Sequence, residues 1–137
     1  CFEKSVNSSQ PEASMSKILI IDDSALSRRM IRTILEDGGH TVMEAVDGLS
    51  GIERFSIDKP HMATLDLTMP EMTGFDVLDK LLKVDPEAKV VVVSADIQQS
   101  SREMVKAAGA KGFINKPFVA DDVLRTVDKV LKGGQQG

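Results

Sequence analysis

The sequence contains little cysteine, no long apolar run and no excess of basic charge. Its single cysteine, Cys1, cannot form an internal disulfide, so a reducing compartment is expected, with the cytoplasm as the simplest location. No apolar run approaches the length of a membrane span, and no cationic start leads into an apolar stretch, so neither a membrane protein nor a secretory signal is predicted. The net charge of -4 gives no support to a nucleic-acid partner, which normally needs a basic face.

What is present fits one globular domain. The chain has 137 residues, of which 42% are apolar and 28% charged, and this length is enough to close a single core. Residues 1–14 are polar in character, and Met15 looks like a natural start. We expect residues 1–14 to be a leader, a tag or a disordered extension, residues 15–132 to be the folded domain, and residues 133–137 to be a flexible tail.

The body of the chain alternates between strand-like and helical patterns. Continuous apolar runs predict five strands, at 17–21, 41–45, 62–66, 89–94 and 112–115. Apolar residues at helical spacing predict five helices, at 24–36, from a cap at Asp47 to 55, and at 74–84, 98–108 and 120–131. This (βα)5 pattern predicts an α/β fold with a five-stranded parallel sheet, helices on both faces and the flavodoxin-like strand order 2-1-3-4-5.

Acidic residues stand at the ends of two of these strands. Asp22 and Asp23 follow the first strand, and Asp66 ends the third. The expected strand order places the carboxyl ends of these two strands side by side, at the edge where ligands bind. Clustered carboxylates repel one another unless a cation joins them, and Mg²⁺ is the natural partner for oxygen ligands. The sequence therefore predicts a cation site here.

Two further residues end strands at the same edge. Ser94 ends the fourth strand, and Lys116 follows the fifth. Taken alone, the serine could be a cap, the lysine a solvated surface charge, and the acidic pair the start of a helix. Together with Asp66 they make a site for phosphoryl transfer, in which a carboxylate is the nucleophile and a cation and a hydroxyl hold the phosphoryl oxygens.

Four segments carry a resemblance to a known family: IIDDS at 20–24, LDLTMPEMTG at 65–74, VVSA at 92–95 and GFINKPF at 112–118. In order and spacing they resemble the response-regulator receiver domains of two-component signalling, and in particular the single-domain chemotaxis (CheY-like) type. The resemblance covers nearly all of residues 15–132, which makes it far more specific than any one motif.

The resemblance implies a role for each acid. Asp66 would be the phosphoacceptor. Asp23 would be a direct ligand of Mg²⁺ and Asp22 would act mostly through water, while Asp66 and the backbone carbonyl of Thr68 would complete the protein ligands. Mn²⁺ would be a possible substitute for Mg²⁺.

It also implies roles for residues around the phosphoryl group. Ser94 matches the switch serine or threonine, Lys116 the phosphoryl-binding lysine, and Ala95 a small residue that admits the phosphodonor. Phe113 matches the aromatic switch position, which is often tyrosine, so an output contact through a hydroxyl is lost. The bond before Pro117 would be cis, which aims Lys116 inward.

Two further interpretations concern pairs of residues. Thr68 and Asp96 lie two residues beyond the phosphoacceptor and the switch serine, where the family tunes dephosphorylation through the access of water; both could equally be ordinary loop residues. His40 and His61 lie in expected turns, and we expect exposed histidines there rather than phosphorelay sites.

The expected function is a phosphorylation-activated switch. A sensor histidine kinase would donate a phosphoryl group to Asp66, and the face formed by the fourth helix, fifth strand and fifth helix would then bind a protein target, such as a flagellar switch, a phosphatase or a phosphotransfer domain. Chemotaxis-type output is preferred, and a phosphorelay intermediate is the alternative. A monomer is expected, without nucleic-acid or membrane partners and without turnover of an external substrate.

Other classes are disfavoured by particular residues. A hydrolytic phosphatase of similar topology would carry an acid where Thr68 stands. A flavodoxin-like cofactor binder would need a phosphate loop after the first strand, where Asp22 and Asp23 would repel phosphate. A degenerate receiver that serves only as an interaction module would not need the complete set of site residues.

Overall fold

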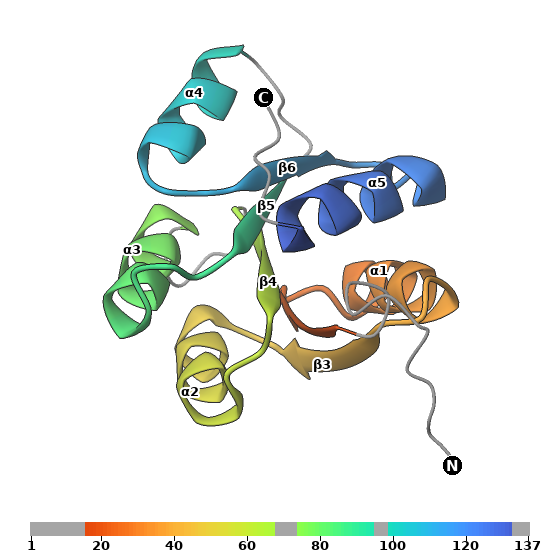
Figure 1. Ribbon diagram of the computed structural model, residues 1–137, viewed down its shortest axis with the longest axis horizontal. Coiled ribbons are helices and arrows are strands. Elements are labelled where there is room, and N and C mark those ends of the chain that lie inside the picture. The colour runs from red at the N-terminus through yellow and green to blue at the C-terminus, as the bar shows by residue number, and fades with distance from the viewer. Residues whose placement is uncertain (1–15, 68–73, 95–98, 133–137) are drawn as a thin grey trace.

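A computed structural model describes residues 16–67, 74–94 and 99–132 of the chain. Its strands form one parallel sheet in the order β3-β2-β4-β5-β6, which confirms the predicted order 2-1-3-4-5 (Figure 1). The strands are β2 (Lys17–Ile21), β3 (Thr41–Ala45), β4 (Met62–Asp66), β5 (Val90–Ser94) and β6 (Gly112–Asn115). The fold class is therefore the predicted one.

Both faces of the sheet are buried, which explains why its strands are continuous apolar runs. Successive residues of a strand point to opposite faces, so each strand contributes to two separate hydrophobic cores. On β2, Leu19 and Ile21 belong to one core, while Ile18 and Ile20 belong to the other. The last residue of each strand lies at the carboxyl edge of the sheet, where polar side chains can collect.

Helices cover the two faces in two layers (Figure 1). One core takes side chains from the second, third and fourth helices, and the other from the first and fifth. None of the helices within the described residues is long and apolar enough to cross a membrane. The helices are α1 (Ala25–Asp37), α2 (Gly48–Asp58), α3 (Gly74–Val84), α4 (Gln99–Ala107) and α5 (Ala120–Leu131).

Two helices begin at side-chain caps. Ser24 caps α1 by accepting a hydrogen bond from the amide of Ser27, and Asp47 caps α2 by accepting one from the amide of Ser50. The end of α2 was predicted too early, at residue 55. The helix runs to Asp58 and stops where Lys59 adopts a left-handed backbone, with φ of 50°.

The exposure of three side chains differs from what the sequence pattern indicates. The apolar pattern of α1 groups Met30 with Ile31, Ile34 and Leu35 on one face, but Met30 is 41% exposed, because the buried stripe of that helix is narrower than its apolar pattern. Met104 on α4 is also largely exposed, while the neighbouring Val105 is buried. The expectation that His40 is exposed is wrong.

His40 is buried at the end of the turn that leads from α1 into β3. Its backbone amide donates to the carbonyl of Leu35, and burial lowers the pKa of its imidazole, although the negative charge of Asp128 acts against this. Its Nδ1 atom has no hydrogen-bond partner among the described residues. His61, by contrast, is exposed, and its Nδ1 accepts a hydrogen bond from the amide of Lys17.

Candidate functional site

The sheet register brings the predicted site residues to one edge. Ile21 of β2 pairs with Leu65 of β4, so Asp22 and Asp66 are the next residues on two neighbouring strands. Asp66 in turn lies beside Val93 of β5. The carboxylates therefore meet because the two strands end in register.

Asp22, Asp23 and Asp66 form one cluster. Each offers a carboxylate oxygen, and these three oxygens lie within 4.8 Å of one another. Asp22 and Asp66 are buried, with 3% and 2% of their surface exposed, while Asp23 is exposed. Two buried acids and one exposed acid make a site that is sheltered on the protein side and open on the other.

The environment of Asp22 opposes its ionisation. Burial is the largest cause, and together with the nearby charge of Asp66 it raises the pKa of Asp22 to about 6. The hydrogen bond that the amide of Ser24 donates to the Asp22 carboxylate and the positive charge of Lys116 both act in the opposite direction. The anion at Asp22 is therefore held at a free-energy cost that a bound cation would relieve.

Lys116 reaches this cluster from β6. Its Nζ atom lies 3.1 Å from Oδ2 of Asp66 and 3.9 Å from Oδ2 of Asp22. The peptide bond between Lys116 and Pro117 is cis, and the backbone amide of Lys116 donates to the carbonyl of Ser94. Ser94 itself is buried at the end of β5. The ammonium, the acids and the hydroxyl-bearing residue thus come from four strands that end at the same edge.

The donor set fits a divalent cation such as Mg²⁺. Carboxylate oxygens are the ligands that hard cations prefer, and three of them converge here. The raised pKa of Asp22 is a second indication, because a cation placed among these oxygens would stabilise the charged form. Asp22, Asp23 and Asp66 are the described residues that could hold the ion.

Sequence reasoning missed two residues beside the acids. Arg28 on α1 donates from Nη1 to the backbone carbonyl of Asp22 at 2.8 Å, and its Nε atom lies 2.9 Å from Oε1 of Glu44. Glu44 belongs to β3, one residue before Ala45, whose carbonyl accepts from the amide of Asp22. The available signal was the basic residue Arg28 soon after the acidic pair, but nothing in the sequence indicated that its side chain turns back toward Asp22.

The remaining predicted site residues divide into two groups. Phe113 is buried on β6, on the face covered by α2, α3 and α4. Thr68, Ala95 and Asp96 lie outside the described residues, so their expected roles stay predictions.

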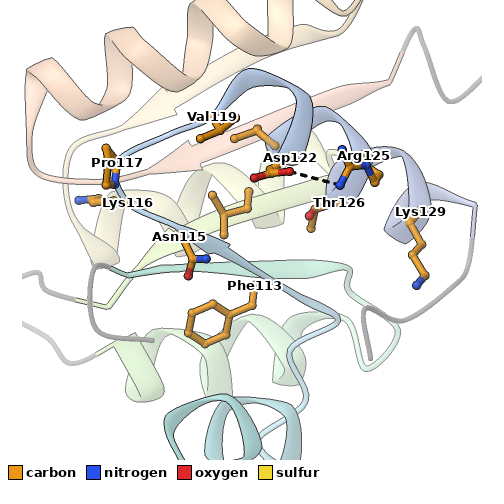
Figure 2. A pocket seen from close by; sticks show the side chains of 11 residues that line it. Phe113, Asn115, Lys116, Pro117, Val119, Asp122, Arg125, Thr126 and Lys129 are labelled. Atoms are coloured by element: carbon orange, nitrogen blue, oxygen red, sulfur yellow. Dashed lines mark hydrogen bonds and ion pairs between the residues drawn. The ribbon is translucent and has the colours of Figure 1, made fainter. Parts of the chain in front are cut away.

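A pocket of about 540 Å³ lies next to the site, between β6 and α5. Figure 2 shows it running from Lys116 and Pro117 to Arg125 and Lys129 on α5. Asp122 is paired with Arg125 across 3.2 Å at this surface. The pocket therefore begins at the lysine that contacts the acidic cluster and ends among cationic side chains.

Comparisons with known proteins agree with this arrangement. The family model described as "Response regulator receiver domain" matches residues 18–128. The chain is 41% identical over 117 residues to the chemotaxis protein CheY of Thermotoga maritima, covering 85% of this chain and 98% of that protein. It is 42% identical over 116 residues to the chemotaxis protein CheY of Bacillus subtilis, covering 84% and 97%. Among solved structures, chemotaxis protein CheY4 of Vibrio cholerae is similar with a TM-score of 0.79 and 28% identity, covering 85% of this chain and 98% of that one.

Proposed function

This chain belongs to the response regulator receiver domain family, and we propose from that premise that it is a switch whose activating event is phosphorylation of Asp66. Receiver domains of this kind work in two-component signalling, generally with a histidine kinase and a downstream target, and generally bind Mg²⁺ at an acidic pocket. The observation that carries the proposal is the ion pair of 3.1 Å between Lys116 and Asp66, within the cluster of three acids.

The reaction would be a transfer of a phosphoryl group from a phosphohistidine of a sensor kinase. A carboxylate oxygen of Asp66 attacks phosphorus, an O–P bond forms, and the P–N bond to the imidazole breaks. The electron pair of the broken bond leaves with the imidazole, which takes up a proton. Because the side chain of Asp66 is 2% exposed, the donor has to reach it through the open side of the site.

Two side chains and a bound cation would stabilise the added charge. Lys116 is placed to move its ammonium from the carboxylate to a phosphoryl oxygen, and Ser94 ends the adjacent strand, where its hydroxyl could donate to another. Asp22 and Asp23 would hold Mg²⁺, which supplies further positive charge to the same oxygens.

Output would come from the surface formed by α4, β6 and α5. The pocket on this surface begins at Lys116, so a movement of that lysine toward a phosphoryl group would alter one end of the pocket (Figure 2). Phe113 lies on the same strand and is buried between the sheet and the α2–α4 layer. A partner that prefers the altered surface would then shift the equilibrium toward it.

More specifically, we propose that the protein is a chemotaxis-type regulator. Its support is that the relatives named above are chemotaxis proteins over nearly their whole length. The target would then be a flagellar switch or a phosphatase. A phosphorelay intermediate, which passes the group onward to another histidine, remains the second candidate because the same site chemistry serves both.

The proposal includes three general properties. The protein acts as a monomer and does not turn over an external substrate, since the group that it accepts is attached to its own side chain. It works in the cytoplasm, which the low cysteine content supports.

The test is covalent labelling of Asp66. The protein is incubated with acetyl phosphate and Mg²⁺, and intact mass spectrometry is used to detect one added phosphoryl group. Asp66→Asn should abolish labelling, whereas Asp79→Asn, which removes an exposed carboxylate on α3, should leave it unchanged. Unchanged mass of the wild type in acetyl phosphate, together with no bound signal in the fluorine NMR spectrum after addition of beryllofluoride, would refute the proposal.

A further inference from the structure

We propose that Arg28 and Glu44 are positioning residues for the cation site, and that they act by fixing the backbone turn that carries Asp22 and Asp23. The inference rests on the proposed function, because it concerns the Mg²⁺ that would assist phosphorylation. Neither side chain belongs to the acidic cluster itself.

Three hydrogen bonds at Asp22 hold the turn. The carbonyl of Asp22 accepts a hydrogen bond from Nη1 of Arg28 at 2.8 Å, and the amide of Asp22 donates to the carbonyl of Ala45 at 3.2 Å. The carboxylate of Asp22 also accepts from the amide of Ser24 at 2.9 Å. The peptide groups on both sides of Asp22 are thus fixed, and Asp23 follows directly on the held carbonyl.

The guanidinium of Arg28 is held by two acceptors. Its side chain is only 14% exposed, and its guanidinium binds Glu44 from Nε while Nη1 binds the turn. A planar guanidinium that binds two acceptors at once has little freedom to rotate. The position of Glu44 on β3 is therefore transmitted to the carbonyl of Asp22.

Glu44 forms ion pairs with two arginines of α1. Hydrogen bonds from Arg32 and Arg28 lower the pKa of this carboxyl, with Arg32 as the larger cause, so Glu44 is charged at neutral pH. Since Glu44 and Ala45 are consecutive residues of β3, the strand binds the turn at two points. One point is direct, through the carbonyl of Ala45, and the other passes through the ion pair with Arg28.

Arg32 provides a matched control. It also pairs with Glu44 and lies one helical turn further along α1, but its second ion-pair partner among the described residues is Glu36 and not the turn. Arg28→Met and Arg32→Met each remove one positive charge and one ion pair with Glu44. Only the first removes the hydrogen bond to Asp22.

The experiment measures the Mg²⁺ dissociation constant of the full chain by calorimetry, since the sequence has no tryptophan or tyrosine to report binding. We expect Arg28→Met to weaken Mg²⁺ binding about tenfold, which is typical of residues that orient metal ligands, and Arg32→Met to stay within about twofold. Arg28→Lys should recover part of the affinity, because an ammonium can bind only one of the two acceptors well. Glu44→Gln should weaken binding less than Arg28→Met, since the direct bond to Asp22 remains.

The direction in which Mg²⁺ affinity changes in Arg28→Met distinguishes a positioning role from a purely electrostatic effect. Loss of a nearby positive charge alone would make Mg²⁺ bind more tightly to an acidic cluster. A second readout is the hydrogen-exchange rate of the Ser24 amide in the metal-free protein, which should increase in Arg28→Met and not in Arg32→Met.

Each outcome has one meaning. If the wild type binds no Mg²⁺, the proposed function fails. If the wild type binds and folded Arg28→Met binds equally well or better, this inference is overturned while the proposed function stands. If Arg28→Met does not fold by circular dichroism, Arg28→Lys decides, and equal affinity of that variant and the wild type, with unchanged exchange at Ser24, would refute the positioning role.

Discussion

The raised pKa of Asp22 predicts that the contribution of this residue to the stability of the metal-free protein increases when the pH falls from 7 to 5. Its pKa is about 6 in the folded chain, compared with a reference value of 3.8. Between these two values the folded state binds more protons than the unfolded state, so acid favours folding. The contribution is complete below pH 3.8 and is lost as the pH rises through 6.

The magnitude follows from the two pKa values. Between pH 7 and pH 5, protonation of Asp22 adds about 1.3 kcal/mol to the free energy of unfolding. His40 acts in the opposite direction, because burial lowers its pKa and the unfolded chain takes up a proton first as the pH falls. The wild-type curve therefore contains opposing contributions, and the effect of Asp22 has to be taken from a difference.

The assay is urea unfolding followed by circular dichroism, in EDTA, at pH 5, 6 and 7, for the wild type and Asp22→Asn. The Asn variant keeps the size of the side chain but does not titrate, so its stability relative to the wild type should fall by about 1.3 kcal/mol between pH 7 and pH 5. A stability difference that is the same at all three pH values would refute the reasoning.

The same pKa predicts how Mg²⁺ binding depends on pH. A proton on Asp22 competes with the ion, so protonation of this residue alone should weaken the apparent affinity about tenfold between pH 7 and pH 5. Calorimetry at the two pH values checks this. An affinity that does not change would mean that Asp22 takes no part in binding the ion.

Further predictions concern three other positions. Lys116→Met should slow labelling by acetyl phosphate roughly a hundredfold, because it removes the ammonium 3.1 Å from Asp66, while Mg²⁺ affinity by calorimetry is retained or increased; labelling at the wild-type rate would contradict this. Gly51→Ala should destabilise the protein by about 1–3 kcal/mol in urea unfolding, because the added Cβ would lie 2.8 Å from Cδ1 of Ile21, and an unchanged midpoint would show that this contact relaxes freely. Leu78→Ala, which truncates a buried side chain of α3, should cost about 2–5 kcal/mol of stability and leave the Mg²⁺ dissociation constant of the folded protein unchanged. A large loss of Mg²⁺ affinity would show that packing at Leu78 also influences the acidic cluster.

Most of the fold could be read from the sequence because its strands are buried on both faces. Runs such as those of β4 and β5 have no polar face, and this pattern is typical of a parallel sheet. Helix ends were harder. The end of α2 depends on the left-handed backbone of Lys59, a residue type with no special preference for that conformation, and the sequence gives no warning of it.

Side-chain exposure was predictable only where the apolar stripe of a helix is wide. The buried side of α5 follows its pattern, whereas Met30 on α1 lies at the border of its stripe and points outward. His40 was misplaced because a polar residue beside glycines suggests an exposed turn. Gly39 is indeed exposed, but the side chain of His40 is buried.

The acids and Lys116 could be placed at one edge of the sheet because strand order alone brings them together. The contact between Arg28 and Asp22 could not, since it depends on the rotamer of a long side chain and on the end of β3. Sequence patterns locate residues on elements, but they do not report which way a flexible side chain turns.

The division of the interior into two cores has a consequence for how such a domain can vary. The sheet backbone separates the core under α1 and α5 from the core under α2, α3 and α4, so most side chains of one core do not touch those of the other. The effects of substitutions in the two layers on stability should therefore add. The core under α2, α3 and α4 can therefore accumulate substitutions that suit a new partner. The packing of the other core, which supports α1 and the residues that fix the acidic turn, stays unchanged.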